Sequence, residues 1–581
     1  MRKFTLFFAL ILCVSGLRSF AQGILSNSKV SGSFQIDAQY YSLDESLGIT
    51  QEYLNDVRKG NPLGLNGFGK INYSLGNFSA GMRYEACLTP LSGFDARMQG
   101  HGIANIYAMY DNGMIGVTVG DFYEQFGNGL VLRSYEEWTL GYDNALRGMR
   151  VVFRPTAGVT LKGVYGAQRL FWEAYNSRKG IVRGLDAEWN LGESFSKMQA
   201  SDFNATFGVS AVSKYQPDFN PIYNLPENVA AFAGRANLSF GKFSFSTEYA
   251  YKINDPSAIN NYIYKEGQSL LASLSYAQKG LGVVLQVKRV DNMSYKSDYA
   301  AEGSVLDINF IPPINRMHSY SLSSLYPYAT QPNGEMAGQF QVDYKIPKGS
   351  ALGGKYGMGI SLNFSQVNDI VRNVTDEAGN VTQIAANEVT PGTWGYTSPF
   401  FGISDHVFFR DINVVIDKKI NKNWKFNVEY VNLYYDIATI EGHSGMDPVK
   451  THIGILDMTY SFAKRHSLRL EIQGLWDTGD YSEIEEAELG NYKKAGNWAS
   501  AMLEYTFAPK WFIALSDKWN YGNPVDDYKQ HYYTVSAGYI KGATRISLTA
   551  GRQNEGMLCV GGVCRLVPAS SGVTLSITTS F

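Results

Sequence analysis

The last eleven residues of the chain, 571–581, define an extended strand with two chemically different faces. Successive side chains of a strand point to opposite faces, so residues two apart share a face. One face is apolar except for Thr579 and carries Val573, Leu575, Ile577 and Phe581. The other face is a row of small hydroxyls, formed by Thr574, Ser576, Thr578 and Ser580. Such a strand separates an apolar medium from a polar one, as in a half-buried sandwich or a barrel wall.

The same alternation recurs from residue 29 to the end of the chain, and its turns carry strong hairpin signals. Residues 67–87 predict a hairpin around Gly76-Asn77, and residues 103–122 predict another around Asp111-Asn112-Gly113. Counting such segments gives about 24 strands, within a range of about 22–26 because strand boundaries are read poorly from sequence. No linker or repeat separates smaller units, which favours one large antiparallel structure over an array of β-sandwiches.

An even number of strands places the short turns at one end of the structure and the long connections at the other. Six long connections are polar and rich in Tyr, Asn, Gly and Ser: residues 42–66, 124–143, 291–333, 366–407, 477–496 and 553–570. Loops of this length are uncommon in compact soluble domains and ordinary at the outer surface of membrane barrels. The sequence therefore predicts an all-β fold, a single transmembrane antiparallel β-barrel with short periplasmic turns and long extracellular loops.

Aromatic side chains provide an independent indication of a membrane. Eleven of them fall within a few residues of a predicted short turn: Tyr73, Trp189, Phe240, Phe243, Tyr344, Trp424, Phe462, Phe507, Trp511, Tyr539 and Phe581. Aromatic residues gather where lipid meets water, so this clustering predicts a belt at one interface.

The amino terminus predicts export. Arg2 and Lys3 precede an apolar run, and Ser19-Phe20-Ala21 is typical of a signal-peptide cleavage site. We therefore expect a signal peptide at 1–21, a short periplasmic segment at 22–28, a barrel at 29–581, and location in the bacterial outer membrane. Loss of Arg2, Lys3 and Arg18 leaves 48 basic residues (51 minus 3) against 53 acidic ones, a net charge of −5. This mild charge argues against a nucleic-acid partner.

Two of the four cysteines are close in sequence. Cys559 and Cys564 flank four residues, and in an exported protein such a pair predicts a disulfide, here at the extracellular tip of the last hairpin. Two thiolates without a nearby His or further Cys cannot complete a zinc site. The sequence also lacks HExxH, GxSxG, CxxC and P-loop patterns. We therefore expect no enzymatic activity, no cofactor and no metal site.

The predicted inner face carries charges of both signs in similar number, so we expect a wet lumen without strong ion selectivity. One segment, from Asp121 to Arg150, is denser in charge than the rest. It predicts a loop that folds inward and narrows the pore, and a solvated surface loop is the alternative. The candidate constriction residues are Glu124, Arg133, Glu136, Arg150 and Arg154.

That segment, together with Gly163 to Arg169, the Cys559–Cys564 turn with Arg565 and Pro568, and the Phe581 ending, resembles an uncharacterised Bacteroidota outer-membrane β-barrel family. The resemblance covers nearly the whole mature chain and implies a porin-like barrel without a settled activity. Resemblance to other barrels also implies that Phe581 is an insertion signal read by the barrel-assembly machinery.

Two functions remain open. The first is a passive porin-like channel for a small polar solute. The second is a surface-display or assembly barrel whose long loops bind an outer-membrane protein or a ligand, with the lumen occluded. Strands begin by about residue 29, which leaves no room for the plug of an energised receptor. Outer-membrane lipid is an expected partner in either case.

Overall fold

The computed structural model describes residues 28–173, 180–443, 445–481, 490–560 and 563–581. The predicted signal peptide, 1–21, and residues 22–27 lie outside this part of the chain.

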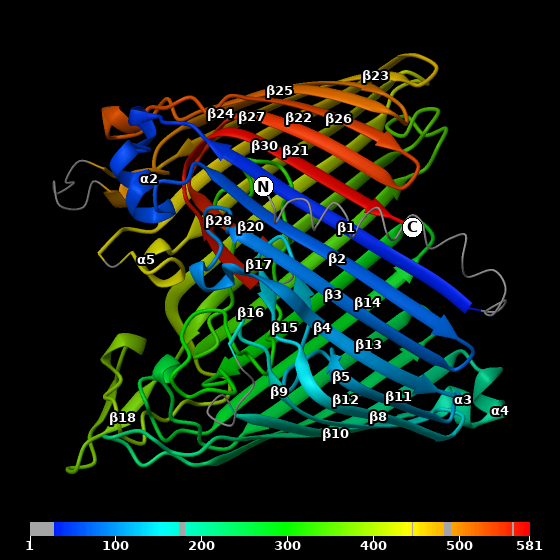
Figure 1. The fold of residues 1–581 in the computed structure, drawn as a ribbon, viewed down its shortest axis with the longest axis vertical. Helices are drawn as coiled ribbons and strands as arrows, with labels where there is room; N and C mark the ends of the chain where they lie inside the picture. Colours follow the sequence, from blue (N-terminus) through cyan, green and yellow to red (C-terminus); the bar gives the residue numbers. More distant parts are fainter. Residues whose placement is uncertain (1–27, 174–179, 444, 482–489, 561–562) are drawn as a thin grey trace.

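Twenty-four antiparallel strands form one closed sheet (Figure 1), which confirms the predicted fold and strand number. The first twelve barrel strands are β1 (Ser28–Tyr41), β2 (Leu63–Leu75), β3 (Phe78–Thr89), β4 (Gly100–Asp111), β5 (Ile115–Phe122), β8 (Leu146–Thr156), β9 (Val159–Gln168), β10 (Ile181–Asn190), β11 (Phe203–Tyr215), β12 (Asn228–Phe240), β13 (Phe243–Lys252) and β14 (Gly267–Gln278). The others are β15 (Leu281–Asp291), β16 (Gly334–Ile346), β17 (Met358–Ile370), β20 (Ile403–Lys419), β21 (Trp424–Tyr435), β22 (Val449–Ala463), β23 (His466–Asp477), β24 (Trp498–Phe507), β25 (Trp511–Trp519), β26 (Thr534–Lys541), β27 (Thr544–Gln553) and β30 (Ser570–Ser580).

The barrel closes between its terminal strands. β1 pairs with β2 on one side and with β30 on the other, and Ile36 faces Ile577 across the seam. Gly32 and Phe581 exchange two backbone hydrogen bonds, of 2.9 and 3.0 Å, at the end of this seam. Because every strand has two neighbours, the barrel has no free edge.

Turns and loops divide between the two ends as the sequence predicts. The six long connections that the sequence indicates span residues 42–62, 123–145, 292–333, 371–402, 478–497 and 554–569. Small elements lie in the connections: β6 (Glu136–Glu137), β7 (Tyr142–Asp143), β18 (Asn373–Thr375), β19 (Val381–Gln383), β28 (Gly556–Val560), β29 (Val563–Val567), α2 (Gln51–Arg58), α3 (Leu191–Ser194), α4 (Ser196–Gln199) and α5 (Ile437–Ile440). No helix in the described residues is long and apolar enough to cross a membrane.

The outer surface of the wall is apolar. Mid-strand residues such as Leu185 and Val209 are 69% and 63% exposed. Contact of these apolar side chains with water would cost free energy, whereas contact with lipid does not. Eight of the predicted belt aromatics are strongly exposed: Trp189, Phe240, Phe243, Tyr344, Trp424, Phe462, Trp511 and Phe581. An even-stranded closed barrel with such a surface is characteristic of the bacterial outer membrane, and the protein is an outer-membrane barrel.

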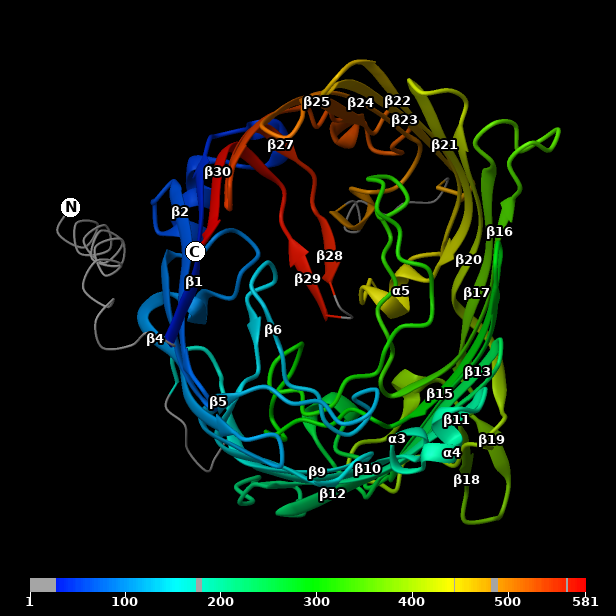
Figure 2. The same cartoon turned by 90° about the vertical axis from the view of Figure 1, so that its right-hand side faces the viewer.

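The interior differs from the expected wet lumen. Long loops fold inward, and Figure 2, which looks into the barrel, shows β6, β28 and β29 inside the ring of strands. Inner-wall charges beneath the loops are buried, among them Arg83, Glu85, Asp186, Glu248, Lys288 and Glu429. Asp343, Asp417 and Arg545, near the short turns, remain exposed. The expectation of a wet lumen is therefore wrong for the part of the wall that the loops cover.

Two separate clusters of buried apolar side chains hold these loops. One joins residues 122–132 and 293–311 to the inner face of β9–β13 and β15. The other joins residues 314–328 to the inner face of strands from β16 to β24. The loops look polar in sequence, but each contributes enough apolar residues to cover an arc of the wall.

Candidate functional site in the barrel lumen

The loop between β5 and β8, residues 123–145, lies against the inner wall. Phe126 and Leu130 are fully buried, and Arg133 donates its backbone N–H to the carbonyl of Ile308 at 2.8 Å. At the loop tip, the backbone N–H and side-chain amide of Asn128 donate to Glu248 of β13, at 2.7 and 2.9 Å. The loop thus crosses from β5 to a strand several positions away along the wall.

The glycines on either side of Asn128 allow this attachment. Gly127 has a φ of 52° and Gly129 a φ of 94°, which are left-handed conformations that favour glycine. A Cβ on Gly127 would lie 2.4 Å from the Glu248 carboxylate. The tight turn therefore lets two donors reach one buried carboxylate.

The structure brings together two of the five candidate constriction residues. Arg150 donates to Glu124 at 2.5 Å, and Lys162 donates to the second carboxylate oxygen of Glu124 at 3.0 Å. Glu124 is only 8% exposed. These contacts fix the start of the loop to β8 and β9.

The other three candidates lie elsewhere. The guanidinium of Arg133 stacks on Tyr135 and Phe310, at 4.0 and 3.8 Å from their ring centroids. Arg154 pairs with Asp111 at 3.3 Å beside the β4–β5 turn, at the short-turn end and away from the loop. Glu136 belongs to a third group, the charged network of β3.

This charged network joins the loop to β3 and to the loop that follows β9. It consists of Arg83, Glu85, Glu136, Asp143 and Arg169. Arg169 binds Glu85 at 2.6 Å and Asp143 at 2.5 Å, and Arg83 contacts both carboxylates and Glu136. Burial raises the pKa of Asp143, but Arg169 and Arg83 outweigh it and hold that pKa below its usual value. The carboxylate is therefore charged and fully compensated.

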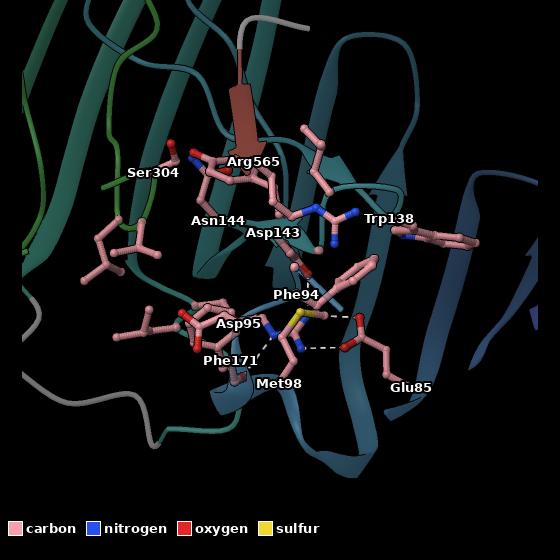
Figure 3. A pocket seen from close by; sticks show the side chains of 18 of the residues that line it. Glu85, Phe94, Asp95, Met98, Trp138, Asp143, Asn144, Phe171, Ser304 and Arg565 are labelled. Carbon is pink, nitrogen blue, oxygen red and sulfur yellow. Dashed lines mark hydrogen bonds and ion pairs between the residues drawn. The ribbon is translucent and has the colours of Figure 1, made fainter. Parts of the chain in front are cut away.

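A cavity of about 400 Å³ adjoins the network. Phe68, Glu85 and residues of five segments line it: 93–98, 138–144, 169–171, 304–306 and 564–566. Figure 3 shows Arg565 reaching toward Phe94, and the guanidinium lies 3.8 Å from the centroid of that ring. The walls combine aromatic faces, such as Trp138 and Phe171, with cationic and anionic groups. This size and composition are typical of small-molecule sites.

The predicted disulfide between Cys559 and Cys564 is confirmed. The two residues face each other across the β28–β29 hairpin. The hairpin lies inside the barrel, however, and Cys564 lines the cavity. The predicted position at an extracellular tip is therefore wrong. The hairpin packs inward instead, and it lies so close to Gly93 that a Cβ on this residue would be 2.8 Å from the Leu566 carbonyl.

Sequence reasoning singled out Asp143, Asn144 and Arg169 but did not predict that they share a cavity with Arg565, Phe94 and Trp138. Arg565 drew attention only through a family resemblance, and Phe94 and Trp138 drew none. Their spacing along the chain carries no signal, since they meet only after three loops fold inward. Within the described residues, no group of three or more His, Cys, Asp or Glu side chains could hold a metal ion.

Comparison with known proteins shows resemblance in fold. A search of curated sequences finds no match. A chain of the Escherichia coli P pilus tip assembly intermediate PapC-PapD-PapK-PapG aligns with 9% identity and a TM-score of 0.44, covering 95% of this chain and 60% of that one. The siderophore receptor PirA of Pseudomonas aeruginosa aligns with 8% identity and a TM-score of 0.38, covering 95% and 80%. OccK11 of Pseudomonas aeruginosa aligns with 7% identity and a TM-score of 0.29, covering 96% and 97%.

One sequence family accounts for the whole chain. Its match extends over residues 1–581, and the family is described only as one of unknown function. This outer-membrane barrel belongs to the family DUF6029.

Proposed function

We propose that this barrel is a passive channel for small polar solutes, whose route is set by the loops folded against its inner wall. The observation that carries the proposal is the presence of two apolar clusters on different arcs of the wall, which meet only at the partly buried Leu271. A plug that sealed the lumen would build one continuous core across it. A barrel of this strand number can enclose an aqueous path, since barrels of 16–18 strands already do.

The inner-wall charges favour weak selectivity. Cations and carboxylates on the wall are paired with each other, as in Arg235 with Asp186 at 2.8 Å and Lys288 with Glu335. A paired wall presents little net field to a passing ion. The proposed channel therefore discriminates by size and by local contacts more than by sign of charge.

Reconstitution into a planar bilayer tests the proposal. We expect discrete conductance steps and a small reversal potential in a salt gradient. A well-folded barrel that never conducts, at any voltage below dielectric breakdown, would contradict the channel. A liposome-swelling assay with neutral sugars of increasing size then measures the cut-off.

A surface-display or assembly role is the second candidate, favoured by exposed apolar side chains on long loops. Trp394 and Phe401 are both 80% exposed, and Ile222 is 78% exposed. Large apolar groups in such positions mark interaction surfaces. Cross-linking in intact cells at position 394 would detect an outer-membrane partner.

The finer expectations on biogenesis are also proposals. The chain is proposed to be a Bacteroidota export that loses residues 1–21, and its Phe581 is proposed to engage the barrel-assembly machinery. Amino-terminal sequencing of the outer-membrane protein should begin at Gln22. Any other start would refute the proposed cleavage.

A further inference from the structure

The Arg565 side chain is a cation without an anionic partner at a cavity where every carboxylate is already paired. Glu85 binds Arg83 and Arg169, Asp143 binds the same two arginines, and Asp95 binds Arg97 at 2.7 Å. Arg565 has no ion pair in the described part of the chain, and its Nε and Nη1 are buried without a hydrogen-bond acceptor there. A buried donor without an acceptor costs free energy, more so when it is charged.

The ring of Phe94 compensates only one face of this cation. At 3.8 Å from the centroid, the guanidinium lies over the ring and gains a cation–π attraction. Stacking uses the face of the guanidinium and leaves its in-plane N–H donors free. Burial lowers the pKa of Arg565 to about 10, as expected for a cation whose charge is poorly compensated. Nη2 is the guanidinium nitrogen outside that buried pair, so an anion in the cavity would meet the cation through Nη2.

We propose that this cavity binds a small planar carboxylate, with Arg565 holding the carboxylate and the aromatic walls holding the apolar body of the solute. A guanidinium is always charged and binds a carboxylate through charge-assisted hydrogen bonds. Phe171 and Trp138 contribute aromatic surface to the same cavity, with Phe68 stacked on Trp138 at 4.9 Å and Arg97 over Phe171 at 4.8 Å. The volume of about 400 Å³ admits a small ligand.

Two contacts hold the β28–β29 hairpin, which carries Arg565, in place beside the cavity. Cys559 and Cys564 staple it next to the arginine, and Leu566 packs its backbone against Gly93. Gly93 has a φ of 81° and immediately precedes Phe94. The cation and the ring beneath it are therefore positioned by the same backbone contact. This inference deepens the proposed channel function by naming a class of solute, and it depends on that function only for passage across the membrane.

The test is calorimetric titration of the purified full-length protein in detergent with benzoate, benzamide, cyclohexanecarboxylate and inorganic phosphate. We expect benzoate to bind, cyclohexanecarboxylate to bind more weakly, and benzamide not to bind. Arg565→Gln should weaken benzoate about tenfold or more, since it removes charged hydrogen bonds. Phe94→Leu should reduce the preference for benzoate over cyclohexanecarboxylate.

The matched control is Arg465→Gln, which removes one arginine in the β22–β23 turn at the opposite end of the barrel. It should bind benzoate as the wild type does. Equal binding of benzoate and benzamide, no binding of either at millimolar concentration, or full binding by a folded Arg565→Gln would each overturn the proposal. Tighter binding of phosphate than of benzoate would also overturn it, because the site would then select charge and not a planar carboxylate.

The binding site and the channel can be tested independently of each other and of the folding of the variant. If Arg565→Gln fails to fold, the comparison among the four probes on the wild-type protein still decides the question. Binding is measured without transport, so a barrel that binds benzoate but does not conduct refutes the channel and retains the site. A barrel that conducts and binds no carboxylate retains the channel and refutes the site.

Discussion

At the scale of single residues, His318 is the clearest example of a loop side chain that anchors to the wall. Its ring nitrogens lie 3.0 Å from Asp411 and 2.9 Å from Glu429, and all three side chains are almost fully buried. Burial alone would lower the pKa of His318, but hydrogen bonds to both carboxylates outweigh it and raise the pKa to about 9. The ring is therefore a cation that compensates two buried anions.

The sign of the pH dependence follows from this raised pKa. The anchoring free energy is fully present below the ordinary histidine pKa of about 6.5 and is lost as pH rises through about 9. Limited proteolysis of the loop 292–333 should therefore accelerate between pH 7 and pH 10. Exposed His531 pairs with the half-buried Asp517 outside the loop 292–333, so His531→Gln is a matched control that should leave the profile unchanged.

Replacing His318 tests the same contact at constant pH. His318→Gln leaves Asp411 and Glu429 without their cation, which should destabilise the loop by about 3–5 kcal/mol, as for other broken buried pairs. Its proteolysis should be fast and nearly independent of pH. Wild-type protection of the loop in this variant would show that the apolar cluster alone holds the loop.

At the scale of elements, the loop 123–145 is expected to limit the pore. Replacing residues 125–135 with a short Gly-Ser turn removes Asn128, its bonds to Glu248, and the buried Leu130. Single-channel conductance should rise, and larger sugars should pass. A matched control shortens the loop 371–402 at β18–β19, where all residues except Asn373 are exposed. Unchanged conductance in the first variant, with normal folding, would place the loop outside the conducting path.

The β28–β29 hairpin is a second separable element. Its disulfide closes a short loop, so the entropic gain is modest, on the order of 2 kcal/mol. Cys559→Ser with Cys564→Ser should therefore leave thermal unfolding of the barrel almost unchanged while exposing the hairpin to protease. Hydrogen exchange of residues 556–560 measures the local effect. A large loss of barrel stability would show that the hairpin supports the wall.

The elements differ in how far the sequence predicts them. Wall strands and short turns follow from local signals, namely period-two alternation and residues such as Asp111-Asn112-Gly113, so their number was predictable. The inward course of the loops depends on packing between distant segments, for instance in the cluster that buries both Phe126 of one loop and Tyr295 of another. Arg565 likewise becomes notable only when Phe94 lies beneath it. No local sequence pattern predicts the inward course of the loops or the position of Arg565 over Phe94.

At the scale of the whole molecule, the loops pack on the inner face of the strands, so their positions depend on closure of the barrel. Period-two alternation specifies which face meets lipid, and that information suffices for a barrel because every strand repeats the same two-sided pattern. The seam between β1 and β30 joins segments more than five hundred residues apart in the chain. It is therefore a contact that no local hairpin supplies, and closure of the barrel depends on it.

Deleting residues 572–581 should abolish the barrel. The deletion removes nearly all of β30 and leaves β1 and β27 with unpaired edges, which lipid cannot satisfy. Heat-modifiable migration in outer-membrane fractions should disappear. A milder change, Gly32→Val, tests the seam itself, because a Cβ at Gly32 would lie 2.5 Å from the Phe581 ring and 2.7 Å from the Lys70 carbonyl. Deleting the hairpin residues 556–567 removes a segment of similar length without touching a wall strand, and that protein should still form a barrel. If the 572–581 deletion folds as well as the hairpin deletion, closure does not require β30.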